Sequence, residues 1–117
     1  MVGCQYSLVS RWVIISLLSG VSYATCADTI SEARQQALMN LLQQDCGSCH
    51  GLTRQGGLGP SLLPDALAGY DDDFLLQTIL DGRSGTAMPP WKLFITEPEG
   101  RWLIQQLRQG PDSSITH

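Results

Sequence analysis

The chain has 117 residues, seven of them lysine or arginine and eleven aspartate or glutamate, which gives a formal net charge of −4 at pH 7. This length suits one domain with a modest core. The acidic balance argues against nucleic acid or an anionic membrane surface as a partner, and favours a partner protein with a basic docking patch.

The beginning of the chain has the pattern of a secretory signal peptide. The positive charge of Arg11 precedes an apolar run, and small side chains follow as far as Ala27. We predict a signal peptide over residues 1–27, with cleavage after Ala24 as the alternative to Ala27. A single domain over residues 28–117 would then reach the periplasm without stable membrane insertion. An uncleaved anchor stays open, although the uncharged stretch after Arg11 is shorter than the roughly 20 residues that span a bilayer.

A helix is predicted next, from about Thr29 to about Gln44. Its start matches a capping box, in which Thr29 is the N-cap and Glu32 reaches back to it. Apolar side chains then recur at helical spacing and predict one buried face, made of Ile30, Ala33, Ala37, Leu38, Leu41 and Leu42. This helix is expected to run directly into a pair of cysteines.

Residues 46–50, Cys-Gly-Ser-Cys-His, form a C-x-x-C-H motif, which is the pattern of covalent haem attachment. On one turn of helix the thiols of Cys46 and Cys49 point the same way, so each can add to one vinyl group of a haem. His50 is then held next to the iron and becomes its first axial ligand. The motif therefore predicts one haem c.

Three other interpretations of the motif stay open. A redox dithiol of the thioredoxin kind uses C-x-x-C, but at the end of a strand rather than after a helix. A structural zinc site needs about four ligands, and Cys4 and Cys26 would be lost with the signal peptide. A disulfide between Cys46 and Cys49 would close a very short and strained loop.

Residues 51–69 are predicted to form a loop, because seven glycines and prolines interrupt any regular period. A loop this long in a small domain is expected to wrap around something. We expect its glycines to let the backbone lie flat against the haem. A phosphate-binding loop is the rival interpretation, but no strand precedes the glycines and no lysine follows them in the required register.

A second helix is predicted between Asp71 and Gly82. The acidic run at residues 71–73 suits the positive end of the helix dipole, and Gly82 suits the end of the helix. A docking site for a basic partner, or for a cation, is the alternative interpretation of the acidic run.

The last predicted helix follows a second capping box, at residues 96–99, and ends at Gly110. It carries an apolar stripe made of Trp102, Leu103, Ile104 and Leu107. No segment of the predicted domain alternates with period two for long enough to make a sheet. The predicted fold class is therefore all-α.

Met88 is the candidate for the second iron ligand. Pro89 and Pro90 follow it and fix the backbone, so the thioether is presented at small entropic cost. A thioether opposite an imidazole stabilises ferrous iron and favours electron transfer; an ordinary core methionine is the alternative. Two protein ligands leave no open position on the iron, so we predict no enzymatic activity. A gas-binding or peroxidatic haem protein would need Met88 to dissociate.

This order of elements resembles the class I c-type cytochromes over nearly all of the predicted domain. The resemblance implies a small all-α cytochrome c fold wrapped around one covalent haem, with the first and last helices crossing at right angles. It also implies that the carbonyl of Pro60 meets the imidazole of His50.

A narrower resemblance is to the cytochrome c55X subgroup. It rests on five short runs, at residues 46–53, 57–60, 67–69, 79–83 and 88–91. It implies a periplasmic electron carrier of denitrification that donates to cytochrome cd1 nitrite reductase, with a role in maturation of that enzyme's d1 haem as the alternative. Arg83 and Trp91 are candidates to bind the haem propionates; a solvated arginine and a core tryptophan are the alternatives. We expect a monomer with redox proteins as partners.

Overall fold

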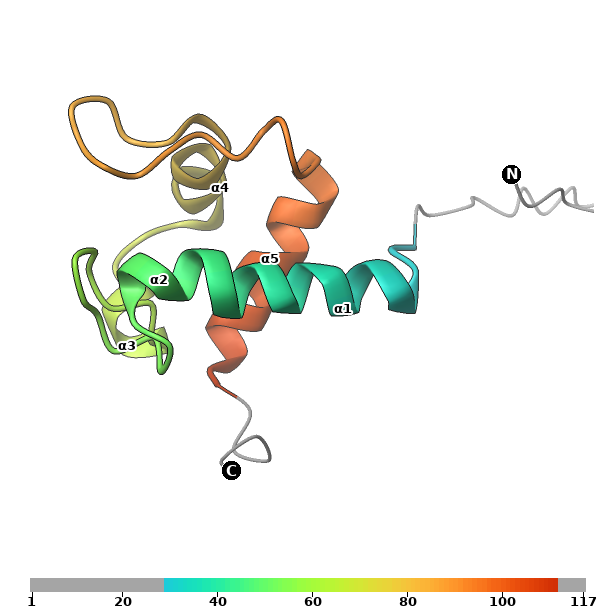
Figure 1. Cartoon of the computed structure of the whole chain (residues 1–117), viewed down its shortest axis with the longest axis horizontal. Helices are drawn as coiled ribbons and strands as arrows, with labels where there is room; N and C mark the ends of the chain where they lie inside the picture. The colour runs from blue at the N-terminus through green and yellow to red at the C-terminus, as the bar shows by residue number, and fades with distance from the viewer. Residues whose placement is uncertain (1–28, 112–117) are drawn as a thin grey trace, which may run out of the picture.

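The computed structural model describes residues 29–111, and these are helical, with no strand among them (Figure 1). The helices in chain order are α1 (Glu32–Leu41), the π-helix η1 (Leu42–Cys46), α2 (Gly47–His50), α3 (Pro64–Leu67), α4 (Asp72–Asp81) and α5 (Glu97–Gln109). The predicted all-α class is confirmed. The predicted signal peptide lies outside the described residues. Within residues 29–111, no helix is both long enough and apolar enough to cross a membrane.

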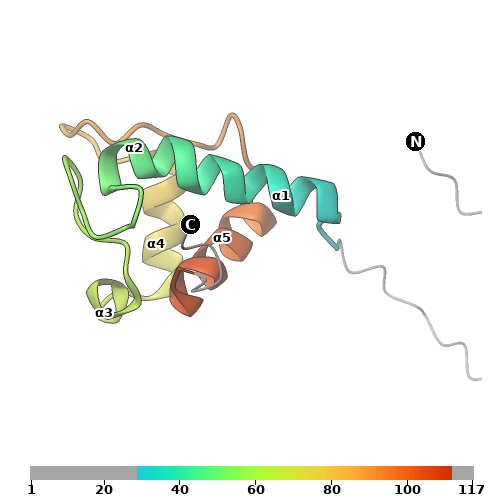
Figure 2. The same ribbon diagram turned by 60° about the horizontal axis from the view of Figure 1, so that its bottom comes forward.

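The first three helices form one continuous rod that ends in the cysteine motif (Figures 1 and 2). The rod begins later than predicted, because Ser31, not Thr29, is the N-cap and accepts a hydrogen bond from the Arg34 N–H at 3.3 Å. Serine is as good an N-cap as threonine, and the prediction of Thr29 as the N-cap is wrong. The predicted apolar face is also too wide, since Ala33 and Ala37 are exposed.

The centre of the core is α5, which packs against α1, α3 and α4. It crosses α1, as the resemblance to cytochromes implies (Figure 1). The buried apolar residues come from these four helices, from η1 and from the segment before α5: they are Leu38, Leu42, Leu67, Leu75, Leu76, Ile95, Leu103, Ile104 and Leu107. Most of the predicted stripe of the last helix is thus buried, and Trp102 packs against the core from its edge.

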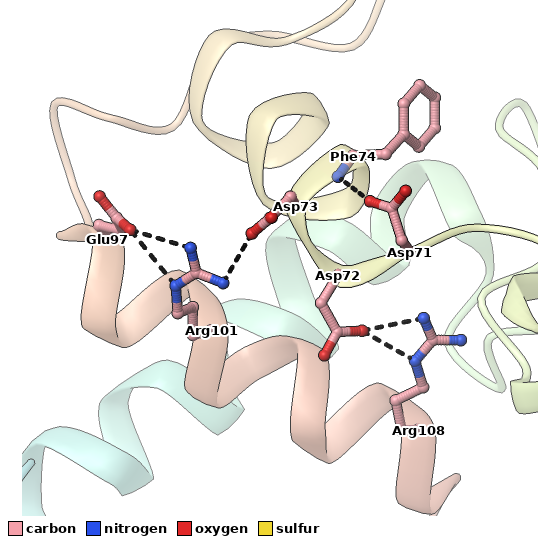
Figure 3. A network of polar contacts seen from close by, with 7 residues as sticks. All are labelled: Asp71, Asp72, Asp73, Phe74, Glu97, Arg101 and Arg108. Atoms are coloured by element: carbon pink, nitrogen blue, oxygen red, sulfur yellow. Dashed lines mark hydrogen bonds and ion pairs between the residues drawn. The ribbon is translucent and has the colours of Figure 1, made fainter.

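The acidic run at the start of α4 makes contacts within the fold (Figure 3). Asp71 is the N-cap and accepts a hydrogen bond from the Phe74 N–H at 2.7 Å. Its two neighbours reach across to α5, where Asp72 pairs with Arg108 and Asp73 with Arg101, each at 2.9 Å. These contacts favour the capping interpretation over a docking site for a partner.

The last helix begins with a capping box, as predicted. The segment predicted as a loop before α4 contains a short helix. The Thr96 N–H donates to Oε2 of Glu99 at 2.7 Å, which is the reciprocal half of a capping box. Residues 51–69 contain the four-residue helix α3, which begins at Pro64. Proline suits the first position of a helix, but so short a helix leaves no periodic signal in the sequence.

An ion pair ties α1 to α5. The Arg34 guanidinium donates to both carboxylate oxygens of Glu99, with the Nη2–Oε2 distance at 3.1 Å, and also to the carbonyl oxygen of Phe94 at 2.9 Å. The hydrogen bond from Arg34 holds the pKa of the Glu99 carboxyl at about 2, below its usual 4.5. The pair therefore clamps the two crossing helices and the segment between α4 and α5.

Truncating the centre of the core is expected to cost more stability than truncating an exposed leucine. Leu38 is fully buried, whereas Leu93 is 84% exposed. We expect Leu38→Ala to lower the free energy of unfolding by about 2–5 kcal/mol, and Leu93→Ala by less than about 0.5 kcal/mol. Urea titrations of the purified proteins measure both values, and equal losses would contradict this packing.

The Arg34–Glu99 pair predicts a pH dependence of stability. The pKa of Glu99 is lower in the folded protein than in the unfolded chain, so its contribution is complete above about pH 4.5 and is lost as the pH falls towards 2. We expect Glu99→Gln to have a lower urea midpoint than the parent protein at pH 6. The difference between the two midpoints is expected to be smaller at pH 3. Glu32→Gln, at the exposed start of α1, is the control. A constant difference across this pH range would contradict the assignment.

Candidate cofactor site

A cavity of about 660 Å³ lies between the helices, and every described helix contributes to its wall. The wall is mainly apolar, with leucines from α1, η1, α3, α4 and α5. All of the site residues predicted from the sequence line this one cavity: Cys46, Cys49, His50, Pro60, Arg83, Met88 and Trp91. The fold thus gathers residues from three separate segments around a single space.

His50 is held in one orientation at the cavity wall. Its side chain is buried, and its Nδ1 lies 2.7 Å from the carbonyl oxygen of Pro60. A carbonyl oxygen only accepts, so Nδ1 carries the proton and donates, which leaves the lone pair of Nε2 available to a metal. The contact implied by the resemblance is present.

The loop after α2 brings Pro60 to this position by folding back onto the end of the helix. The Gly56 N–H donates to the His50 carbonyl oxygen, and the Gly59 N–H to that of Cys49, each at 2.8 Å. A Cβ on Gly59 would lie 2.7 Å from Cε1 of the His50 ring, so no larger residue fits there. The expectation that these glycines lie against the haem needs correction, because Gly59 alone among them lines the cavity and its close contact is with the imidazole.

The two cysteines are half-buried free thiols. Burial raises the pKa of the Cys46 thiol to about 11, and the nearby carboxylate of Asp45 contributes. A redox dithiol needs the opposite shift, towards the thiolate, so this alternative is disfavoured. The zinc alternative also loses support, since no three histidine, cysteine or acidic residues within residues 29–111 gather as a metal site would require.

The remaining predicted residues approach the cavity from the segment that follows α4. Met88 is half-buried and lines the cavity. Trp91 packs against the core and also lines the cavity, so the two interpretations of this tryptophan are compatible. Arg83 is exposed and contributes to the cavity wall.

Sequence reasoning missed an aromatic pair in the cavity wall. Tyr70 and Phe74 stack with ring centroids 5.1 Å apart and an interplanar angle of 14°. Both line the cavity while remaining 50% and 43% exposed, as does Leu58, which is 93% exposed. The aromatic spacing of four residues across the start of α4 was the available signal. These side chains give the cavity an apolar margin open to solvent.

The residues of this site fit a covalent haem. The cavity is large and apolar, two thiols lie in its wall, and an imidazole whose Nδ1 is engaged by a carbonyl lines the same cavity as a thioether. Fold and site together define a c-type cytochrome. Residues 33–106 match the family model described as "Cytochrome C oxidase, cbb3-type, subunit III".

Comparison with individual proteins narrows the family. The chain is 45% identical to cytochrome c55X of Pseudomonas aeruginosa over 100 residues, which cover 85% of this chain and 84% of the relative. It is also similar to the solved structure of c-type cytochrome NirC, with a TM-score of 0.66, 47% identity and coverage of 68% of this chain and 93% of the other. The chain belongs to the cytochrome c55X family, and it is a monohaem electron-transfer cytochrome that carries covalent haem c through Cys46 and Cys49.

A further similarity is to part of a larger protein. The solved structure of dihydro-heme d1 dehydrogenase NirN in complex with DHE matches with a TM-score of 0.58 and 34% identity. The match covers 62% of this chain and only 16% of that chain. The shared part is therefore a cytochrome domain within a longer polypeptide.

The packing of Gly59 against His50 predicts a local defect when a methyl group is added. We expect Gly59→Ala to displace the imidazole and to lower the free energy of unfolding by about 1–3 kcal/mol, with less haem bound per protein. Gly69→Ala is the control, because its Cβ would meet nothing within 4 Å. A pyridine haemochrome assay and a urea titration measure the two effects. Equal haem content and equal free energies of unfolding in the two variants would contradict the close contact between Gly59 and the His50 ring.

Proposed function

We propose that this protein is a single-electron carrier whose haem iron is held by His50 and Met88. The observation that carries the proposal is that His50, with Nδ1 engaged by Pro60, lines the same cavity as Met88 and both motif cysteines. A bound haem c takes up and releases one electron. With both side chains on the iron, no position is open to a substrate, so the protein has no enzymatic activity of its own.

Arg83 and Trp91 are proposed to hold the haem propionates. The support is that both line the cavity and that both side chains end in N–H donors, which carboxylates accept. Arg83 is exposed, which suits a contact at the rim of the cavity rather than in its interior. Pro60 acts through His50, by fixing the tautomer that leaves Nε2 free.

The protein is proposed to work as a monomer in the periplasm. Support comes from the sequence pattern of a signal peptide over residues 1–27, which leaves residues 28–117 as the working domain. A covalently attached haem suits an exported carrier, because the cofactor cannot diffuse away. The partners are proposed to be redox proteins that contact the apolar margin of the cavity.

The proposed pathway is denitrification, with cytochrome cd1 nitrite reductase as the electron acceptor. The similarity to cytochrome c55X supports this placement. A second candidate is an accessory role in the maturation of the d1 haem of the same reductase. It is favoured by the similarity to a domain of a protein named for action on dihydro-haem d1.

Deleting the gene separates the two candidates. A reductase that still carries d1 haem, but is reduced slowly by the periplasmic electron supply, supports the carrier. A reductase that lacks d1 haem supports the maturation role. In either case, restoring the gene with Cys46 and Cys49 replaced by alanine is expected not to rescue, because the haem is lost.

Ligation by Met88 predicts a spectroscopic loss on substitution. We expect Met88→Leu to abolish the weak methionine-to-iron charge-transfer band, to lower the reduction potential, and to let the reduced protein bind carbon monoxide. Met39→Leu is the matched control, since Met39 is half-buried against the core and does not line the cavity. A Met88→Leu protein that kept the band would rule out this ligand. A parent protein that bound carbon monoxide readily would favour the gas-binding alternative.

A further inference from the structure

The residues between α4 and Met88 form a small closed loop. The Arg83 N–H donates to the carbonyl oxygen of Met88 at 3.2 Å, which joins the two ends of the loop. Inside it, the backbone N–H and the hydroxyl of Thr86 donate to the carbonyl oxygen of Arg83, at 3.1 and 2.8 Å. The Met88 N–H donates to the Thr86 hydroxyl oxygen at 3.3 Å. The backbone of Met88 is therefore held at both its N–H and its carbonyl.

The same segment is attached to the end of α4. The last carbonyls of a helix have no partner within the helix, and here the Trp91 N–H donates to Ile79 and the Lys92 N–H to Leu80, each at 3.1 Å. The side chain of Lys92 also pairs with Asp81 at 3.1 Å. The chain on either side of Met88 is thus fixed to one helix end, which gives the methionine a rigid base.

Gly82 follows α4 directly and is in close contact with the backbone of residues 88–90. Its φ of 70° and ψ of −168° fall in a region that essentially only glycine adopts. A Cβ on Gly82 would lie 2.7 Å from the carbonyl oxygen of Met88, and 2.8 Å from backbone atoms of Pro89 and Pro90. These are main-chain atoms, two of them in stiff prolines, so they cannot rotate away as a side chain would.

We propose that Gly82 is a positioning residue for Met88, which acts by letting the Met88 segment lie directly on the end of α4. The inference rests on the proposed function, in which Met88 is a ligand of the iron. A Cβ at residue 82 has to open the contact from 2.7 Å to at least the 3.4 Å of ordinary van der Waals contact. A functional site tolerates displacements of only about 0.5 Å, so the thioether leaves its ligating position.

The test compares Gly82→Ala with a matched glycine elsewhere. Gly110 ends α5 with nearly the same backbone angles, φ 85° and ψ 176°, but its Cβ would only touch the Pro64 ring at 3.4 Å. Gly110→Ala therefore reproduces the backbone strain without the clash and without contact to Met88. Spectra are normalised to haem by the pyridine haemochrome assay, so a lower yield does not imitate a lost ligand.

We expect Gly82→Ala to retain less than about half of the methionine-to-iron band per haem, to have a lower reduction potential, and to bind carbon monoxide when reduced. Gly110→Ala is expected to keep the parent band and potential, although it unfolds more easily. An unchanged band in Gly82→Ala, or the same loss in Gly110→Ala, would overturn the inference. If Met88→Leu itself keeps the band, Met88 is not the ligand and the proposed function is wrong. This result is therefore distinguishable from a failure of the inference about Gly82.

A second variant keeps the test decisive if Gly82→Ala yields no holoprotein. Thr86→Val removes the hydroxyl that bonds to both Arg83 and Met88, and it loosens the same loop without adding a clash. We expect a partial loss of the band and an intermediate potential. A Thr86→Val protein with the parent spectrum and potential would overturn the idea that this loop positions Met88.

Discussion

The structure depends on a cavity at its centre, because residues that would otherwise complete the core line an open space of about 660 Å³. Leu42, Leu67, Leu75, Leu103 and Leu107 belong both to the buried core and to the cavity wall. A haem in this cavity would therefore pack directly against core residues. A domain this small has little stability to spare, so we expect attachment of the haem to stabilise the folded state.

The two proposed iron ligands are supported in the same physical way. His50 is the last residue of α2, and the returning loop caps that helix end while Gly59 touches the imidazole. Met88 follows α4, and its segment caps the end of that helix while pressing on Gly82. In each case the last carbonyls of a helix, which have no partner within the helix, accept hydrogen bonds from a loop. A glycine at the contact allows the loop to lie close to its neighbour. The two helix ends thereby position the two proposed ligands.

The helices and the identity of the site were largely predictable from the sequence, whereas the loops were not. The motif at residues 46–50 specifies its chemistry through residue type and spacing alone, and a glycine marks the end of α4. Helix α3 escaped prediction because it is too short to show a period, and the first helix begins at the N-cap Ser31 rather than at the predicted Thr29. The structural roles of Gly59 and Gly82 depend on contacts between segments, which no local pattern reveals.

The lysine and arginine residues of the described part of the chain fall into two groups. Four of the six lysine and arginine residues within 29–111 pair with carboxylates: Arg34, Lys92, Arg101 and Arg108. The other two, Arg54 and Arg83, have no carboxylate partner among residues 29–111, and both belong to the segments around the haem site. Burial lowers the pKa of Arg54, which means that its charge is partly withdrawn from water. Of these two arginines, Arg83 lines the haem cavity, which agrees with the role proposed for it at the haem propionates.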